Sequence, residues 1–249
     1  MSVQTAAIIL AAGYGKRLGG ENQKTLIRIL GKPMLCHLIG TLKYCNISKI
    51  IVVIGFQKEK VIEELKDEDV TFAEQTQLLG TGHAVMMTEG VLSNFSGNVL
   101  VLYGDVPFLR AETIKALRQT HKNTLADCTI LTAIVNNPDG YGRIIRNKSG
   151  EIIRIVEHIN ANDQEKQIKE INAGVYIFVK GALFEALGRI KPDPVKREYY
   201  LTDVIADFIA NGRKVVSWTT PTPEEPIGIN TPEARTKAEQ YLLSRRIKI

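Results

Sequence analysis

The chain carries a glycine-rich turn that could bind phosphate. Residues 10–18 read LAAGYGKRL, so an apolar segment leads directly into small residues and two glycines. Small residues let a backbone approach a ligand closely and point its amide N–H groups at phosphate oxygens. Arg17 and, further on, Lys24 add positive charge, and an arginine side chain can bind phosphate through two hydrogen bonds. The turn therefore predicts a site for a phosphorylated ligand.

Two better-known glycine motifs do not fit this turn. Gly13 and Gly15 match the start of the dinucleotide fingerprint G-x-G-x-x-G, but Leu18 stands where the third glycine belongs. No acidic residue follows at the ribose-binding distance, and no Gly-Lys-Ser/Thr sequence closes a Walker A loop. Because a lone glycine motif is a weak signal, a plain glycine turn with basic surface residues is the alternative.

Further motifs follow the turn along the chain. They are Gly31-Lys32-Pro33, Gln75, Leu79 to Ala84, Tyr103 to Pro107, Gly140 to Ile144, Val156 to His158, Glu170 to Asn172 with Gly174, Glu198 to Tyr200, and Gly228 to Asn230. With these motifs in this order, the chain resembles the sugar-1-phosphate nucleotidylyltransferases. In particular, it looks like the N-acetylglucosamine-1-phosphate uridylyltransferase domain of the bifunctional bacterial enzyme. The resemblance covers nearly the whole chain.

The resemblance implies a role for each matched position. Arg17 and Lys24 would neutralise phosphate charge in catalysis. Asp105 and Asn230 would hold Mg²⁺, a cation that prefers oxygen ligands and bridges phosphates. Among the nucleotide-binding residues, Gln75 would read the uracil edge, because a carboxamide both donates and accepts hydrogen bonds. The nucleotide-binding set would be Leu10, Ala11, Ala12, Gly13, Gln75, Gly80 and Thr81, and the sugar-binding set Tyr103, Gly104, Gly140, Glu157 and Asn172.

Several of these residues also have a purely structural interpretation. Asp105 could cap the turn after its strand, Glu157 could be a solvated edge-strand residue, and Asn230 could begin a helix. His83 opens a predicted helix and is interpreted as structural rather than catalytic. Asn172 is harder to explain in this way, because a polar amide before a buried strand needs hydrogen-bond partners.

The chain departs from the family pattern in two places. Lys16 stands where the family usually has Thr, and Leu18, Gly19 and Gly20 follow the motif arginine. An added lysine beside phosphates could alter the affinity for a triphosphate. The bifunctional enzyme also continues into a left-handed β-helix that acetylates glucosamine 1-phosphate, whereas hexapeptide repeats are absent here. Acetyltransferase activity is therefore not expected, and the oligomeric state stays open because the family's trimer contacts lie mainly in that domain.

The implied activity is Mg²⁺-dependent transfer of a uridylyl group from UTP to N-acetylglucosamine 1-phosphate, with release of pyrophosphate. A phosphate monoester is already an anionic nucleophile near neutral pH, so this reaction needs no general base. One alternative is the same chemistry on glucose 1-phosphate with UTP or dTTP. A second is a non-catalytic regulator that binds nucleotide sugars, although such a protein would be expected to lack part of the phosphate or metal set.

The elements that must position these residues follow from the hydrophobic pattern. The first half alternates apolar runs with amphipathic segments, as in β-α units around a mostly parallel sheet. We expect strands at 6–10, 49–54, 70–73 and 98–103, buried on both faces because nearly every position is apolar. Helices are expected at 33–44, with Pro33 in the first turn, and at 57–66, 81–92 and 111–121.

The second half is less regular. We expect strands at 128–135 and 173–179, a hairpin of 143–146 with 152–156, a helix at 201–211 and a loop at 219–226. The predicted fold class is α/β, a Rossmann-like mixed, mostly parallel sheet flanked by helices, of the nucleotide-diphospho-sugar transferase type. One nucleotidylyltransferase domain would span 1–230, with its nucleotide-binding half at about 1–110 and its sugar-binding half at about 111–230. A C-terminal helix would follow at 231–249.

Composition favours small anionic partners. The formal net charge is +5, but the 32 Lys and Arg are scattered among 27 Asp and Glu, without the basic face that nucleic acid needs. The longest apolar runs, 6–12 and 50–54, are far too short to cross a membrane, and no secretory signal is apparent, so we expect a cytoplasmic protein. Cys36, Cys45 and Cys128 show no metal-ligand spacing and are expected to be reduced and partly buried.

Overall fold

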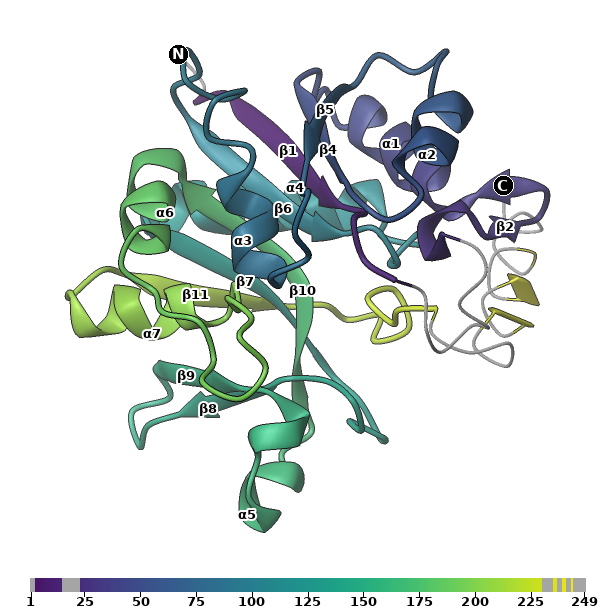
Figure 1. Ribbon diagram of the computed structural model, residues 1–249. Helices are drawn as coiled ribbons and strands as arrows, with labels where there is room; N and C mark the ends of the chain where they lie inside the picture. The colour runs from purple at the N-terminus through teal and green to yellow at the C-terminus, as the bar shows by residue number, and fades with distance from the viewer. Residues whose placement is uncertain (1–2, 15–22, 230–234, 237–238, 241–242, 244–249) are drawn as a thin grey trace.

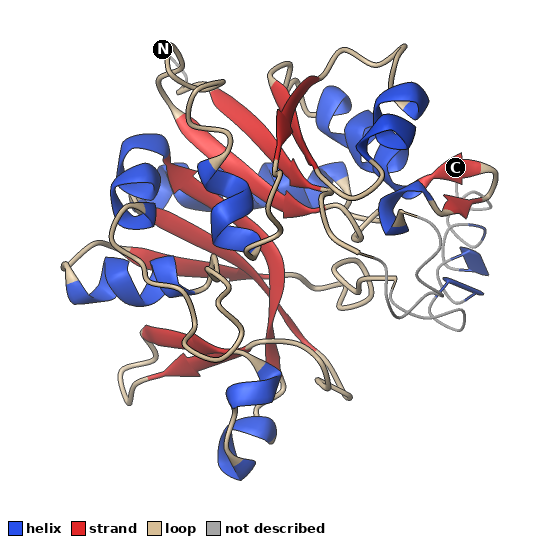
Figure 2. Ribbon diagram, viewed as in Figure 1, coloured by secondary structure: helices blue, strands red, loops and turns tan. Residues whose placement is uncertain are grey.

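A nine-stranded sheet forms the centre of the protein (Figures 1 and 2). The structure, a computed structural model, describes residues 3–14, 23–229, 235–236, 239–240 and 243. The main path of the sheet runs β11-β7-β10-β6-β1-β4-β5, and the hairpin β8-β9 joins it at β10. The strands are β1 (Thr5–Leu10), β4 (Ile50–Ile54), β5 (Thr71–Glu74), β6 (Asn98–Tyr103), β7 (Cys128–Ile134), β8 (Arg143–Arg146), β9 (Ile152–Val156), β10 (Glu170–Val179) and β11 (Val215–Thr219).

Strand direction brings the predicted site residues to the carboxyl ends of the parallel strands. β6, β1, β4 and β5 are parallel neighbours, and β11 runs parallel to β7, whereas β10 lies antiparallel between β6 and β7. Leu10 pairs with Tyr103 on one side and Val53 on the other, so the segments after β1, β4 and β6 leave the sheet together. The fold class is the predicted one: a mixed, mostly parallel sheet flanked by helices.

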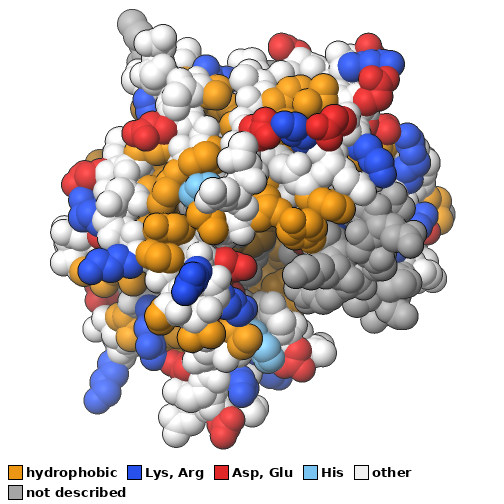
Figure 3. Space-filling view, in the orientation of Figure 1, with side chains coloured by type: hydrophobic (Ala, Val, Ile, Leu, Met, Phe, Trp, Pro, Cys, Tyr) orange, Lys and Arg blue, Asp and Glu red, His pale blue; other side chains and the backbone are white. Residues whose placement is uncertain are grey.

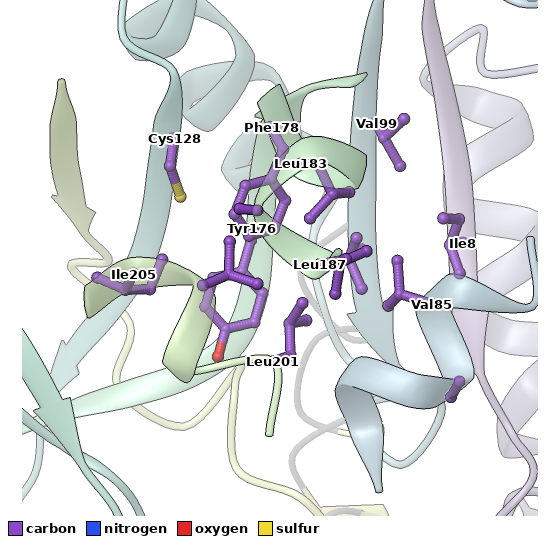
Figure 4. Close-up of a cluster of buried hydrophobic side chains, with 14 of the residues drawn as sticks. Ile8, Val85, Val99, Cys128, Tyr176, Phe178, Leu183, Leu187, Leu201 and Ile205 are labelled. Carbon is purple, nitrogen blue, oxygen red and sulfur yellow. The ribbon is translucent and has the colours of Figure 1, made fainter. Parts of the chain in front are cut away.

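Helices cover both faces of the sheet, because side chains alternate along each strand. On one face, Ile9 packs in a core cluster with Leu38 of α1 (Met34–Tyr44) and Ile114 of α4 (Ala111–Thr124), and α2 (Lys58–Glu64) joins them. On the other face, shown in Figure 4, Ile8 packs in a cluster with Val85 and Leu183. The helices of that face are α3 (Thr81–Met86), α6 (Lys180–Leu187) and α7 (Asp203–Ala210).

The remaining elements are short. β2 (Arg28–Ile29) and β3 (Lys32–Pro33) form a separate two-stranded sheet before α1. Two 3-10 helices, η2 (Lys24–Leu26) and η3 (His158–Asn160), and helix α5 (Asp163–Lys166) complete the described elements. The β8-β9 hairpin and α5 project away from the main sheet in Figure 1.

Some sequence-based expectations were wrong in detail. β5 is not buried on both faces: it lies at the edge of the sheet, with Thr71 and Glu74 exposed. Pro33 is not in the first turn of α1. It is the last residue of β3, where it pairs with Arg28, and α1 begins at the next residue. The helix that begins at Thr81 is shorter than expected, and β11 and α6 were not predicted. The expected C-terminal helix falls largely outside the described residues.

The three cysteines and the helices of the described ranges bear on the expectations from composition. Cys36, Cys45 and Cys128 are all buried with free thiols, as predicted, and burial raises the pKa of Cys128 well above its ordinary value. Within the described ranges, no helix is both long and apolar enough to span a membrane.

Candidate functional site

A cavity of about 650 Å³ opens at the carboxyl ends of the parallel strands. The face seen in Figure 3 is hollowed near its centre. Ligand sites in open α/β sheets lie at the carboxyl ends of the strands. The cavity brings together all seven residues predicted to bind nucleotide. Its lining is Leu10, Ala11, Ala12, Gly13, Tyr14, Gln23, Lys24, Thr25, Gln75, Leu78, Gly80, Thr81, Ala84, Tyr103, Gly104, Asp105, Glu198 and Tyr200.

Gln23 anchors the segment that carries Lys24 to the glycine-rich turn. The Gln23 side chain is 1% exposed, and its Nε2 donates a hydrogen bond to the Ala11 carbonyl. Its Oε1 accepts from the backbone N–H of Thr25 at 3.0 Å, and the backbone N–H of Gln23 donates to Gln57 Oε1 at 3.0 Å. Sequence reasoning missed Gln23, because a single glutamine outside any motif gives no signal. Its bonds fix the Lys24 segment against the wall of the cavity.

Lys24 contacts Asp105 at the floor of the cavity. Nζ of Lys24 forms an ion pair with Oδ2 of Asp105, although the two residues are 81 positions apart. Both side chains are largely buried, with exposed fractions of 16% and 21%. The Ile229 amide donates to the Asp105 carbonyl at 3.0 Å, which brings the chain before Asn230 to the same place. Arg17 and Asn230 themselves lie outside the described residues.

Gln75 and Gly80 also line this cavity. Gln75 is 4% exposed, and its Nε2 donates to the Gly80 carbonyl at 3.0 Å and lies 3.0 Å from His83 Nδ1. Burial lowers the pKa of His83, which favours the neutral imidazole that can accept this bond. The carboxamide is therefore held in one orientation, and His83 contributes by holding it.

Glu198 and Tyr200 line the same cavity from a distant part of the chain. The Tyr199 amide donates to the Leu79 carbonyl at 2.7 Å, and the Gly82 amide donates to the Tyr199 carbonyl at 2.8 Å. Gly80 has φ +95°, and a Cβ there would lie 2.6 Å from the Tyr199 carbonyl oxygen. The two sequence motifs thus pack directly on each other, and only glycine fits at position 80.

A second cavity, of about 160 Å³, is lined by four of the five predicted sugar-binding residues. Tyr103 and Asp105 line both cavities, so the two adjoin at the end of β6. Gly104, predicted to bind sugar, lines the larger cavity instead. The second cavity is lined by Tyr103, Asp105, Val106, Gly140, Tyr141, Gly142, Glu157, Asn172, Ala173, Gly174 and Gly228.

A bulge in β10 directs Asn172 to this second cavity. The pairing of β10 with β7 shifts register between Asn172 and Tyr176, and Gly174 has φ +69° within the shift. Bulges of this kind re-aim side chains near functional sites. The backbone N–H of Asn172 donates to the Gly142 carbonyl at 2.9 Å, which joins β10 to the loop that contains Gly140 and Gly142. Asn172 therefore lies inside the strand, not before it as the sequence suggested.

Glu157 faces the same cavity from the end of β9. It is half-buried rather than a fully solvated edge residue, and desolvation raises the pKa of its carboxyl. The Thr202 hydroxyl donates to Glu157 Oε1 at 3.1 Å. A half-buried carboxylate with one such partner retains acceptor capacity for ligand hydroxyls.

Replacing Gly174 with alanine is expected to damage the site. A Cβ at this position would lie 2.6 Å from Cδ2 of the Tyr103 ring, and φ is positive. Both effects destabilise, so we expect a melting temperature lower by roughly 5 °C and reduced turnover, because Tyr103 must move. Gly181→Ala is the matched control, since a Cβ there contacts nothing within 4 Å. Equal melting temperatures for Gly174→Ala and wild type would contradict this account.

Replacing Glu157 with glutamine is expected to stabilise the free protein at neutral pH. The folded-state pKa is raised, so the folded protein holds its proton more tightly and loses stability as pH rises through that pKa. Glutamine removes this loss, so the gain in melting temperature should vanish below the unfolded pKa of about 4.3, grow as the pH rises through the raised folded-state pKa, and stay constant above it.

Thermal melts across this pH range test the prediction, with the exposed Glu89→Gln as the control. A gain for Glu157→Gln that does not vary with pH would contradict the burial argument.

The Asp105 carboxylate is a suitable ligand for a hard divalent cation whose other ligands would be substrate phosphates and waters. No group of three or more His, Cys, Asp or Glu that could hold a metal occurs among the residues the structure describes. The Asp105 carboxylate does lie where both cavities meet, and a cationic side chain already contacts it. Mg²⁺ commonly keeps several waters and uses one or two carboxylates together with phosphates.

A family model for nucleotidyl transferases matches residues 6–222 of this chain. The match includes both cavities apart from Gly228. The chain belongs to the nucleotidyl transferase family.

Curated relatives are similar along nearly the whole chain. A bifunctional protein GlmU of Streptococcus gordonii is 45% identical over 239 residues, covering 96% of this chain and 52% of the relative. A bifunctional protein GlmU of Geobacillus sp. is 43% identical over 243 residues, covering 98% of this chain and 53% of the relative. The chain therefore spans about half the length of these relatives.

Among solved structures, the chain is similar to a UDP-glucose pyrophosphorylase complexed with UDP-glucose. The TM-score is 0.76 at 18% identity, with 98% of this chain and all of that chain covered. At this identity the likeness shows the fold.

Proposed function

We propose that this chain transfers the uridylyl group of UTP to N-acetylglucosamine 1-phosphate and releases pyrophosphate. The observation that carries the proposal is the meeting of two cavities at Tyr103 and Asp105, with Lys24 beside them. The larger cavity has the small-residue turn and Gln75 at its walls, and the smaller has Glu157 and Asn172. Two ligands bound side by side would meet at the charged pair. The similarity to bifunctional GlmU proteins supports the same reaction.

The reaction is an in-line displacement. A phosphate oxygen of the sugar 1-phosphate forms a new bond to the α-phosphorus of UTP, and the bond from that phosphorus to the bridging oxygen of the β-phosphate breaks. The electron pair leaves with pyrophosphate. Such reactions depend on positioning and charge neutralisation rather than on a base. Mg²⁺ held by Asp105 and Asn230 would supply positive charge to the phosphates.

The side chains of the chain itself would have distinct tasks. Lys24 would neutralise charge on the phosphates from the junction of the cavities, and Arg17 would add to it. The backbone of residues 10–13 would bind the nucleotide, with Gln75, Gly80 and Thr81 around the base. Gly140, Glu157 and Asn172 would bind the sugar hydroxyls and the acetamido group. Preorganised donors of this kind stabilise charge without reorganising during the reaction.

Pyrophosphate release tests the proposal. Purified protein is given Mg²⁺, UTP and, in separate reactions, N-acetylglucosamine 1-phosphate, glucosamine 1-phosphate or glucose 1-phosphate. We expect the fastest release with the acetylated sugar. Fastest release with glucose 1-phosphate would keep the chemistry and overturn the substrate. No release with any sugar, despite nucleotide binding, would overturn the enzymatic proposal in favour of a binding protein.

A further inference from the structure

Tyr176 carries a hydroxyl that core packing alone does not require. It lies in the middle of β10, is 0% exposed, and its ring stacks on Phe178 with centroids 5.6 Å apart. Figure 4 shows Tyr176 among apolar side chains, with its oxygen at the rim of the cluster. A buried hydroxyl lowers stability unless it is hydrogen-bonded, so phenylalanine would serve packing equally well. The partners of this hydroxyl therefore indicate its use.

The first partner is Asn172, on the wall of the smaller cavity. Nδ2 of Asn172 donates to the Tyr176 hydroxyl oxygen at 2.5 Å, and Oδ1 of Asn172 accepts from the Gly174 amide at 3.2 Å. The Gly174 amide can only donate, so the two bonds together define which way the carboxamide faces. The Tyr176 bond is the shorter of the two. One hydrogen of Nδ2 is left for another acceptor.

Tyr103, which lines both cavities, lies close enough to Tyr176 for the two hydroxyls to interact electrostatically. The hydrogen bond of known geometry from the Tyr176 hydroxyl is the one to Asn172, so the hydroxyl acts on the smaller cavity through that residue.

We propose that Tyr176 is a positioning residue that sets sugar specificity through Asn172. Its hydroxyl holds the Asn172 carboxamide in one orientation, so that the second Nδ2 hydrogen serves a carbonyl acceptor on the sugar, such as an acetamido group. Loss of the hydroxyl leaves the carboxamide with the longer Gly174 bond alone, and its donor is no longer fixed. This inference rests on the proposed function for its substrate, but the contact between Tyr176 and Asn172 can be tested without it.

Tyr176→Phe removes the hydroxyl and keeps the ring. We expect the preference for N-acetylglucosamine 1-phosphate over glucose 1-phosphate, measured as the ratio of kcat/KM values, to fall about fivefold, which is the effect of one net hydrogen bond. The fall should come from a higher KM for the acetylated sugar, with the KM for UTP unchanged. Tyr44→Phe removes a hydroxyl from an exposed ring and is the matched control. An unchanged ratio in Tyr176→Phe would overturn the inference.

A double-mutant cycle and an NMR signal separate this inference from the proposed function. In an Asn172→Ala background, Tyr176→Phe should have no further effect on the ratio, whereas a purely structural role predicts additive losses. The side-chain amide signals of Asn172, identified by their loss in Asn172→Asp, should shift in Tyr176→Phe and not in Tyr44→Phe. If the Asn172 signals shift in Tyr176→Phe but the wild-type protein shows no activity, only the proposed function would be overturned. Unshifted signals would overturn the role of Tyr176 whatever the activity.

Discussion

Replacing Asp105 with asparagine is expected to lower turnover by about 100-fold or more, the usual cost of losing one preorganised charge in an active site. The substitution keeps the shape of the side chain and removes its negative charge. Asp105 lines both cavities and pairs with Lys24, so one change weakens the cation site and leaves the lysine without its anion. The backbone bond from the Ile229 amide to the Asp105 carbonyl is not affected, so the fold should persist.

Steady-state kinetics at saturating UTP and sugar phosphate measure this effect, and circular dichroism shows whether the variant folds. Asp67→Asn, on an exposed loop after α2, is the matched control and should keep wild-type turnover. We also expect the Mg²⁺ concentration that gives half-maximal rate to rise in Asp105→Asn. Turnover within threefold of the wild type would show that Asp105 is structural, as a turn cap would be.

Lys24→Met should also reduce turnover by about 100-fold, because the methionine keeps much of the side-chain length and loses the charge. The lysine side chain is 16% exposed and is fixed at the junction of the cavities by the Gln23 bonds. A charge held in place before the reaction favours the transition state, so kcat should fall more than the KM for either substrate rises. Lys66→Met removes an exposed lysine that pairs with Glu63 and serves as the control.

Lys24→Arg distinguishes charge from geometry. Arginine keeps the charge but presents a planar group with a different reach, so partial activity is expected. The losses in Lys24→Met and Asp105→Asn should not add in the double variant, because the two groups are in contact. Wild-type kcat in Lys24→Met, with only a higher KM for UTP, would limit Lys24 to ground-state binding.

The elements that the sequence predicted well are those with a strong local pattern. β6, β8 and β9 match their expected bounds, because an apolar run marks β6 and the turn at 147–150 separates β8 from β9. β11 was missed because its Ser217, Trp218 and Thr219 do not form an apolar run, and it is only half-buried beside β7. β5 was misjudged for the opposite reason, since apolar composition does not reveal that a strand lies at an edge.

The candidate site was predicted by resemblance, and its contacts were not. Motifs give positions along the chain but not which side chains meet, so the pairing of Lys24 with Asp105 could not be read from residues 81 positions apart. Gln23 and Tyr176 carry no local signal: one is a glutamine in a polar stretch, and the other looks like an ordinary core residue of a strand. Both are recognised only from their hydrogen bonds. The roles of all the predicted site residues stay predictions, and Arg17 and Asn230 also lie outside the described residues.

The central claim is tested most directly by a one-pot competition. Purified protein, Mg²⁺ and UTP are incubated with equal concentrations of N-acetylglucosamine 1-phosphate, glucosamine 1-phosphate and glucose 1-phosphate, and the nucleotide sugars are identified by mass spectrometry. We expect UDP-N-acetylglucosamine to predominate, with pyrophosphate formed in equal amount, and about 100-fold less product from the Asp105→Asn variant over the same initial period. A predominance of UDP-glucose, or no nucleotide sugar at all, would contradict the account.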